Sequence, residues 1–190
     1  MELLLSLCVG LGLSAACGFR VFVPLLAIGL ASLTGHLTLA PSFAWMSTGT
    51  AVVAFGTASI LEVGAYYVPW LDHLLDTVAT PAAIVAGSIL TAAMVADLSP
   101  FLRWSLGIIA GGSVAALVQS GTVLARAASL TTTGGFGNPI IATAELAGSI
   151  FATVAALVVP VLAMAMVIGL VTFCAWRWIV PVQRVPSSTK

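Results

Sequence analysis

Three ionisable residues interrupt long apolar stretches of this sequence: Arg20, Glu62 and Glu145. A charged side chain at the centre of a bilayer costs roughly 2.5–3.5 kcal/mol on insertion scales, so such residues face water or the interior of a helix bundle and are usually paired. Arg20 with one of the glutamates is the simplest pair. The pair can be structural and fix helix register, or it can line a polar path with Gln119 as a neutral companion. We favour the polar path, because these are nearly the only charges within the apolar stretches.

A second set of polar residues follows Glu62 along the chain. Glu62 and Tyr66 are four residues apart and share one helix face, and so do Asp72 and Asp76. The three carboxylates together with His73 would suit a hard cation that prefers oxygen ligands. The solvated face of a helix at the membrane interface explains the same residues. We therefore predict no metal site here and place this segment at one mouth of the path.

The sequence does not indicate an enzyme. A membrane enzyme needs a nucleophile with a base, or several His and Asp side chains as metal ligands. The two histidines, His36 and His73, are expected in different loops. The glycines of 134–137 do not follow a strand and so do not form a phosphate loop. We expect no catalytic residue and no cofactor, and we place Asn138, in the Gly-rich loop 131–139, at the other mouth of the path.

The elements that carry these residues must be membrane helices, because the composition fits no soluble fold. Hydrophobic residues make up 61% of the 190 residues and charged residues 6%, against roughly a quarter charged in soluble domains. Six basic and six acidic residues give a net charge of zero, which indicates no nucleic-acid partner. The lipid bilayer is the expected partner. The three cysteines lie in apolar stretches without a Cys-x-x-Cys pair and are expected to be small buried hydrophobes.

The hydropathy pattern predicts an all-α, polytopic helical bundle of about six transmembrane helices of about 20 residues each. The expected spans are 3–33, 43–68, 81–97, 101–125, 140–158 and 161–180, with an amphipathic interfacial helix over 69–78 and a polar tail over 181–190. The first run is interrupted by Gly18 and Pro24, so it is either one tilted, kinked helix or a helix broken near Gly18. Because no basic residue precedes Arg20, we keep the first 17 residues as a helix and not as a cleaved signal.

The basic residues predict the orientation in the cell (inner) membrane. With six spans both termini share a side, and Arg126, Arg177, Arg184 and Lys190 fall on that side, with Arg103 on the other. Basic residues concentrate on the cytoplasmic side of membrane proteins. We therefore expect both termini in the cytoplasm.

A weak internal repeat has two alternative explanations. Gly12-x-x-Ala15-Ala16 recurs as Gly112-x-x-Ala115-Ala116, and 61–65 resembles 144–148. Low-complexity apolar sequence produces such matches by chance. A true duplication would give two three-span halves inverted in the membrane, an architecture that many transporters use.

Small residues recur every four positions on two predicted helices. One set is Ser6, Gly10, Ser14 and Gly18, and the other is Gly107, Gly111 and Ala115. Such faces let two helix backbones approach closely. They can pack within one subunit or between subunits, and we expect a homo-oligomer.

Several segments resemble a known family. They are GLSAACGFRVFVP at 12–24, LEVGAYYVPWLD at 61–72 and TGGFGNP at 133–139. The chain is similar over 5–180 to the bacterial domain-of-unknown-function family 4126. The resemblance implies a multi-pass membrane protein without a settled activity.

The sequence thus favours a transporter or channel for a small solute or ion, with Arg20, Glu62 and Glu145 along its path. The alternative is a membrane scaffold or assembly subunit without cargo, which predicts a dry core, a fully salt-bridged Arg20 and no cavity that reaches the midplane. A membrane enzyme on a lipid substrate would need a lateral opening with a histidine beside a hydroxyl group.

Overall fold

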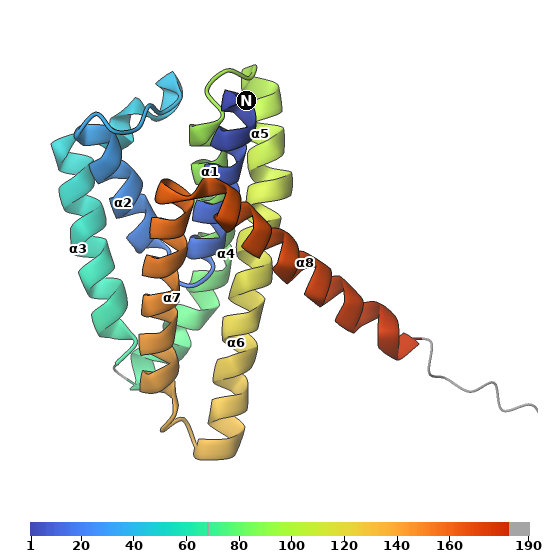
Figure 1. Cartoon of the computed structure of the whole chain (residues 1–190). Coiled ribbons are helices and arrows are strands. Elements are labelled where there is room, and N and C mark those ends of the chain that lie inside the picture. Colours follow the sequence, from blue (N-terminus) through green and yellow to red (C-terminus); the bar gives the residue numbers. More distant parts are fainter. Residues whose placement is uncertain (68, 183–190) are drawn as a thin grey trace, which may run out of the picture.

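The computed structural model describes the backbone of residues 1–67 and 69–182 and the side chains of residues 1–67 and 77–176. All elements in this part of the chain are helices, which confirms the expected all-α class. They are α1 (Glu2–Cys17), α2 (Phe22–Leu33), the 3-10 helix η1 (Pro41–Ser47), α3 (Gly49–Ala65), α4 (Pro69–Met94), α5 (Pro100–Leu106), the π-helical segment η2 (Gly107–Gly112), α6 (Ser113–Thr133), α7 (Asn138–Val158) and α8 (Pro160–Val182). α5, η2 and α6 form one continuous rod (Figure 1).

The first apolar run is broken into two antiparallel helices, α1 and α2, which are joined by a turn inside the bundle (Figure 1). Gly18 begins this turn. A Cβ atom there would lie 2.5 Å from the Cβ of Val118 and 2.7 Å from the carbonyl oxygen of Ala115, so only glycine permits this approach to α6. Arg20 follows and is 1% exposed. The residues expected as one span, 3–33, therefore form a hairpin of two helices, and of the two arrangements that the sequence left open the broken helix is the one observed.

Both free ends of this hairpin lie at the same end of the bundle. Gly10 in α1 packs against Thr91 and Met94 near the end of α4. The N–H of Ala40, which follows α2, donates to the carbonyl oxygen of Ala93 at 2.8 Å. The link between α6 and α7 lies at the opposite end (Figure 1). With 16 and 12 residues, α1 and α2 are each shorter than the about 20 residues that cross a bilayer.

Residues 69–94 form a single helix, α4, where we expected an interfacial helix over 69–78 and a separate span over 81–97. Pro81, expected at a helix start, lies inside α4. A proline removes one backbone hydrogen bond and bends a helix, but the neighbouring helices of a bundle can hold the chain on both sides of it. The amphipathic pattern of 69–78 therefore marks the first turns of a longer helix.

Helices α1, α4 and the α5–α6 rod pack through small residues. The Oγ of Ser14 lies 2.7 Å from the carbonyl oxygen of Gly87 and 2.8 Å from the Oγ1 of Thr91. A Cβ atom at Gly111 would lie 2.4 Å from the Oγ1 of Thr91 and 2.6 Å from the carbonyl oxygen of Gly87. The two predicted small-residue faces are thus used within the chain, and the prediction of a homo-oligomer loses its support from them.

Within the described residues, three helices are long and apolar enough to cross a membrane. They are Thr77–Met94, Pro100–Thr133 and Asn138–Val158, and η1 with α3, bent by 66° relative to each other, would add a fourth. The other apolar helices of the described chain, Glu2–Cys17, Phe22–Leu33 and Pro160–Trp176, are shorter. The structure thus indicates a membrane protein, while six spans and a three-plus-three inverted repeat are not confirmed.

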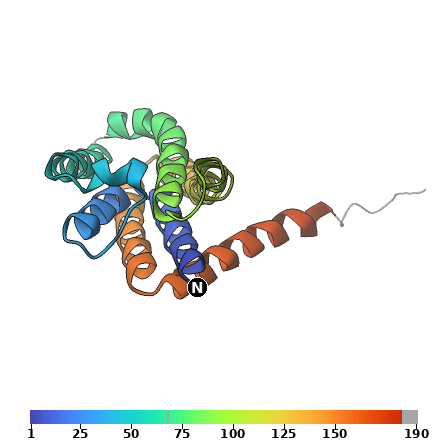
Figure 2. The same ribbon diagram turned by 90° about the horizontal axis from the view of Figure 1, so that it is seen from above.

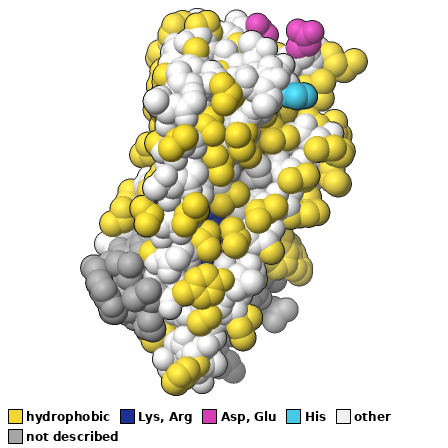
Figure 3. Space-filling model, turned by 90° about the vertical axis from the view of Figure 1, so that its left-hand side faces the viewer, with side chains coloured by type: hydrophobic (Ala, Val, Ile, Leu, Met, Phe, Trp, Pro, Cys, Tyr) yellow, Lys and Arg dark blue, Asp and Glu magenta, His cyan; other side chains and the backbone are white. Residues whose placement is uncertain are grey.

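The outside of the bundle is apolar. Large side chains such as Ile60, Leu124 and Phe151 are exposed. Hydrophobic side chains cover most of the face in Figure 3, with the acidic and histidine side chains gathered at one end. α8 packs on α1 and α7 and hardly touches α6, and its later part projects away from the bundle (Figures 1 and 2). A lipid environment suits this surface better than water.

Candidate functional site: a buried charge cluster beside a lateral cavity

Arg20 lies in the turn of the α1–α2 hairpin and binds α7. Its Nη2 donates to the carbonyl oxygen of Ala142 at 2.9 Å and lies 3.2 Å from the Oε2 of Glu145. This confirms the expected pairing of Arg20 with a glutamate. The Nε and Nη1 atoms of Arg20 are buried and have no hydrogen-bond partner among the described residues. The pair therefore ties the middle of the hairpin to α7 but leaves part of the guanidinium group unsatisfied.

Arg126 is a second partner of Glu145, and the sequence analysis did not select it as a site residue. Its Nε donates to the Oε1 of Glu145 at 3.0 Å, and its Nη2 also contacts the Oε2. We had counted Arg126 as a charge beyond the span 101–125. The structure corrects this, because α6 continues to Thr133 and Arg126 is 4% exposed. The spacing of Gln119, Thr122 and Arg126 on one face of a helix is the signal that could have identified it.

The ring of Tyr66 lies against both arginines. The Cζ of Arg20 is 3.9 Å from the centre of the Tyr66 ring, and the Cζ of Arg126 is 4.1 Å from it. Guanidinium groups at this distance over an aromatic face are attracted by the ring quadrupole. Tyr66, 5% exposed, therefore helps to hold two like charges close together in an apolar interior.

Glu62 does not pair directly with Arg20 but binds the start of α2. Its carboxylate accepts hydrogen bonds from the N–H of Val21 at 2.8 Å and the N–H of Phe22 at 3.1 Å. The first N–H groups of a helix lack partners within the helix, and the helix dipole favours a negative charge there. Glu62 in α3 thus acts as the cap of α2. Glu62 and Tyr66 are brought together on one face, as predicted.

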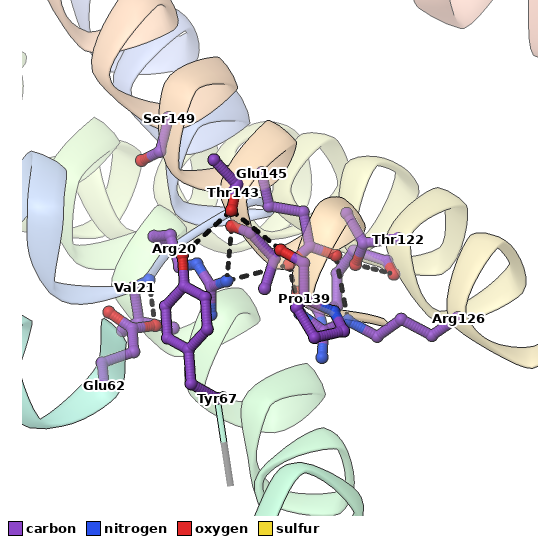
Figure 4. Close-up of polar contacts among 12 residues, drawn as sticks. Arg20, Val21, Glu62, Tyr67, Thr122, Arg126, Pro139, Thr143, Glu145 and Ser149 are labelled. Carbon is purple, nitrogen blue, oxygen red and sulfur yellow. Dashed lines mark hydrogen bonds and ion pairs between the residues drawn. The ribbon is translucent and has the colours of Figure 1, made fainter. Parts of the chain in front are cut away.

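These contacts define a charge cluster of five residues from four parts of the chain: Arg20, Glu62, Tyr66, Arg126 and Glu145. Figure 4 labels Arg20, Glu62, Arg126 and Glu145. Next to it, the hydroxyl groups of Tyr67 and Thr143 are 2.9 Å apart. The cluster joins the hairpin turn, the end of α3, α6 and α7. Its members are between 1% and 7% exposed, so it is enclosed by protein.

The remaining predicted site residues lie in different surroundings. Gln119 is buried in α6, and its backbone carbonyl oxygen accepts a hydrogen bond from the hydroxyl of Thr122 at 2.9 Å. Asn138 is the first residue of α7 and is 8% exposed. The side chains of Asp72 and Asp76 lie outside those described. Within the described residues, no group of three or more His, Cys, Asp or Glu side chains is placed to hold a metal ion.

A cavity of about 700 Å³ lies between α1, α6, α7 and α8. We call it the lateral cavity. Its walls are apolar side chains such as Val118, Val167 and Phe173, and Glu145 and Thr122 are the polar side chains among them. Phe19, in the turn of the hairpin, also lines it. The lateral cavity thus reaches the charge cluster at Glu145.

A family model described as "Domain of unknown function (DUF4126)" matches residues 7–179. The chain belongs to this family. The match contains all five residues of the charge cluster and all the residues that line the lateral cavity. No curated protein and no solved structure matches the chain. Because the DUF4126 family has no described function, any function must be argued from the geometry of these two features.

Proposed function

We propose that the protein is a transporter for a small solute, with the lateral cavity as its binding site. One observation carries the proposal: a cavity of about 700 Å³ reaches Glu145, a residue of the buried charge cluster. Its size is within the roughly 300–1,000 Å³ of most small-molecule sites, and such sites are typically apolar with a few polar groups.

The α1–α2 hairpin is the element that would move during transport. A helix broken at membrane depth is tolerated where it lines a cavity or is buried in protein, and transporters place discontinuous helices at their binding sites. Here Phe19, next to Arg20 in the hairpin turn, lines the lateral cavity. Any shift of the turn would therefore change the shape of the cavity.

The charge cluster favours a transporter over an ion channel. The exposed fractions of its members range from 1% to 7%, so little of the cluster is accessible to water. An ion that passed through the cluster would lose its hydration shell. The carboxylates of Glu62 and Glu145 could not replace it, because they are already bound by the hairpin and the arginines.

Efflux from proteoliposomes tests the proposal. Vesicles are loaded with rubidium ions or with the amphipathic dye rhodamine 6G. We expect at least one probe to leave faster than from vesicles without protein, and Gly121→Phe to abolish the difference.

Gly121 lines the cavity and a Cβ atom there would meet nothing within 4 Å, so the new ring fills the cavity without a clash. Gly169→Phe is the control, because Gly169 has equally open surroundings and does not line the cavity. Equal efflux from both variants, or no efflux above the protein-free vesicles, would contradict the proposal.

A membrane scaffold without cargo is the second candidate, favoured by the enclosed and ion-paired Arg20. This function predicts that Gly121→Phe changes nothing, because a filled cavity leaves a scaffold intact. The efflux experiment therefore also separates the two candidates.

A further inference from the structure

The polar atoms in the walls of the lateral cavity are already engaged. Both oxygens of Glu145 accept from Arg126, and Oε2 is also 3.2 Å from Arg20. The hydroxyl of Thr122 donates to the carbonyl oxygen of Gln119. An ion or a strongly polar solute would therefore give up its hydration in this cavity without gaining matched partners.

The rest of the cavity is built to hold hydrocarbon. Small residues such as Ala15, Gly121 and Ala152 leave the space, and larger apolar side chains such as Leu117 and Phe173 enclose it. Cavities with such walls stay dry and take apolar molecules. The contact chemistry is thus that of an aliphatic chain.

The opening of the cavity faces the side of the bundle. α8 is anchored at its start, where a Cβ atom at Gly12 would lie 3.0 Å from the Cβ of Ala163. Further along, α8 departs from the bundle (Figures 1 and 2) and hardly touches α6. Phe173, which lines the cavity, is 58% exposed, as expected for a side chain that faces lipid tails.

We propose that the lateral cavity binds the hydrocarbon chain of a bilayer lipid, which enters sideways between α6 and α8. This inference rests on the proposed function and names the class of its solute: a lipid-like amphiphile, and not an ion or a sugar-like molecule.

Photolabelling of the full chain in phosphatidylcholine nanodiscs tests this binding. The probe is palmitic acid with a diazirine in its chain, at a low mole fraction, with crosslinked peptides mapped by mass spectrometry. We expect labelling of 117–125 and 163–174 that saturates with the probe and is competed by unlabelled palmitic acid. Gly121→Phe should lower it about tenfold, equivalent to about 1.4 kcal/mol of binding free energy, and Gly169→Phe should leave it unchanged.

Annular lipid alone would give a different result. Labelling would then rise linearly with the probe, include outward residues of α3 such as Val53 and Ile60 equally, and ignore Gly121→Phe. That outcome would overturn the inference. Labelling as expected but without rhodamine efflux would refute the proposed transport and keep the binding site, whereas rubidium efflux without labelling would refute the binding site alone.

Discussion

Glu145 is the residue on which most of the buried charge depends. It accepts hydrogen bonds from Arg126 and forms an ion pair with Arg20, in surroundings where each of the three is at most 5% exposed. Charges so deeply buried gain little net stability when paired, but they cost much when one partner is removed. The residue therefore fixes the position of both arginines and, through Arg20, of the hairpin.

Glu145→Gln removes the charge and keeps the shape of the side chain. We expect the free energy of unfolding in detergent to fall by about 3–5 kcal/mol, because two guanidinium groups then lack their counter-charge. The control is Asp97→Asn, the same change at an exposed residue of the α4–α5 loop, which should stay within about 0.5 kcal/mol of the parent. Equal losses in both variants would show that Glu145 is not the centre of the cluster.

Tyr66 contributes through its ring. Tyr66→Leu should remove two cation–π contacts of about 0.5–2 kcal/mol each, while Tyr66→Phe keeps the ring and should retain most of that stability. Thermal unfolding of the two purified variants measures the difference. If Tyr66→Leu were as stable as Tyr66→Phe, the two contacts with Arg20 and Arg126 would have no energetic role.

At the scale of elements, close packing of small residues holds the helices in register. Gly87 and Gly111 allow α4 and the α5–α6 rod to touch through their backbones. The recurrence of small residues every four positions predicted the face that carries Gly111 from the sequence. It could not say which helix would pack against it, because small residues permit close approach to any partner.

Gly111→Ala tests this packing. The added methyl group would lie 2.4 Å from the Oγ1 of Thr91 and 2.6 Å from the carbonyl oxygen of Gly87. Since the backbone cannot yield, the two helices must separate, and we expect a loss of about 1–3 kcal/mol in unfolding free energy. Gly169→Ala, in open space on α8, serves as the control and should not destabilise the protein. Retained stability of Gly111→Ala would mean that the helices are not this close.

The helices and the contacts between them also show how much of the structure the sequence could predict. The apolar runs predicted helices, and the burial cost of charge predicted that Arg20, Glu62 and Glu145 face the interior of the bundle, where all three are buried. The role of Glu62 could not be predicted, because it caps α2 through a contact between residues 40 or more apart. Arg126 was missed because a charge near the expected end of a span is readily explained as a loop residue.

At the scale of the whole molecule, the hairpin of α1 and α2 changes the expected path of the chain. A single span over 3–33 would place the amino terminus and the link that follows α2 at opposite ends of the bundle. The hairpin places both at the same end (Figure 1). The positive-inside argument is also weakened, because Arg126 and Arg103 are buried. Arg103 donates to the carbonyl oxygens of Ala96 and Leu98 at 2.8 and 3.1 Å. The cytoplasmic location of both termini stays a prediction.

Labelling of single cysteines decides between the hairpin and the span. Because Cys8 and Cys17 are buried, the background needs only Cys174→Ala. Glu2→Cys, Thr34→Cys and Thr132→Cys are then expressed in cells, and sealed vesicles of one orientation are treated with a membrane-impermeant maleimide. The hairpin predicts that Glu2→Cys and Thr34→Cys react from the same side and Thr132→Cys from the other. All three positions are exposed on the protein, so only the membrane determines whether the reagent reaches them. If Glu2→Cys and Thr34→Cys reacted from opposite sides, α1 and α2 together would span the bilayer once. The turn at Arg20 would then not reverse the direction of the chain, and the proposed movement of the hairpin would lose its basis.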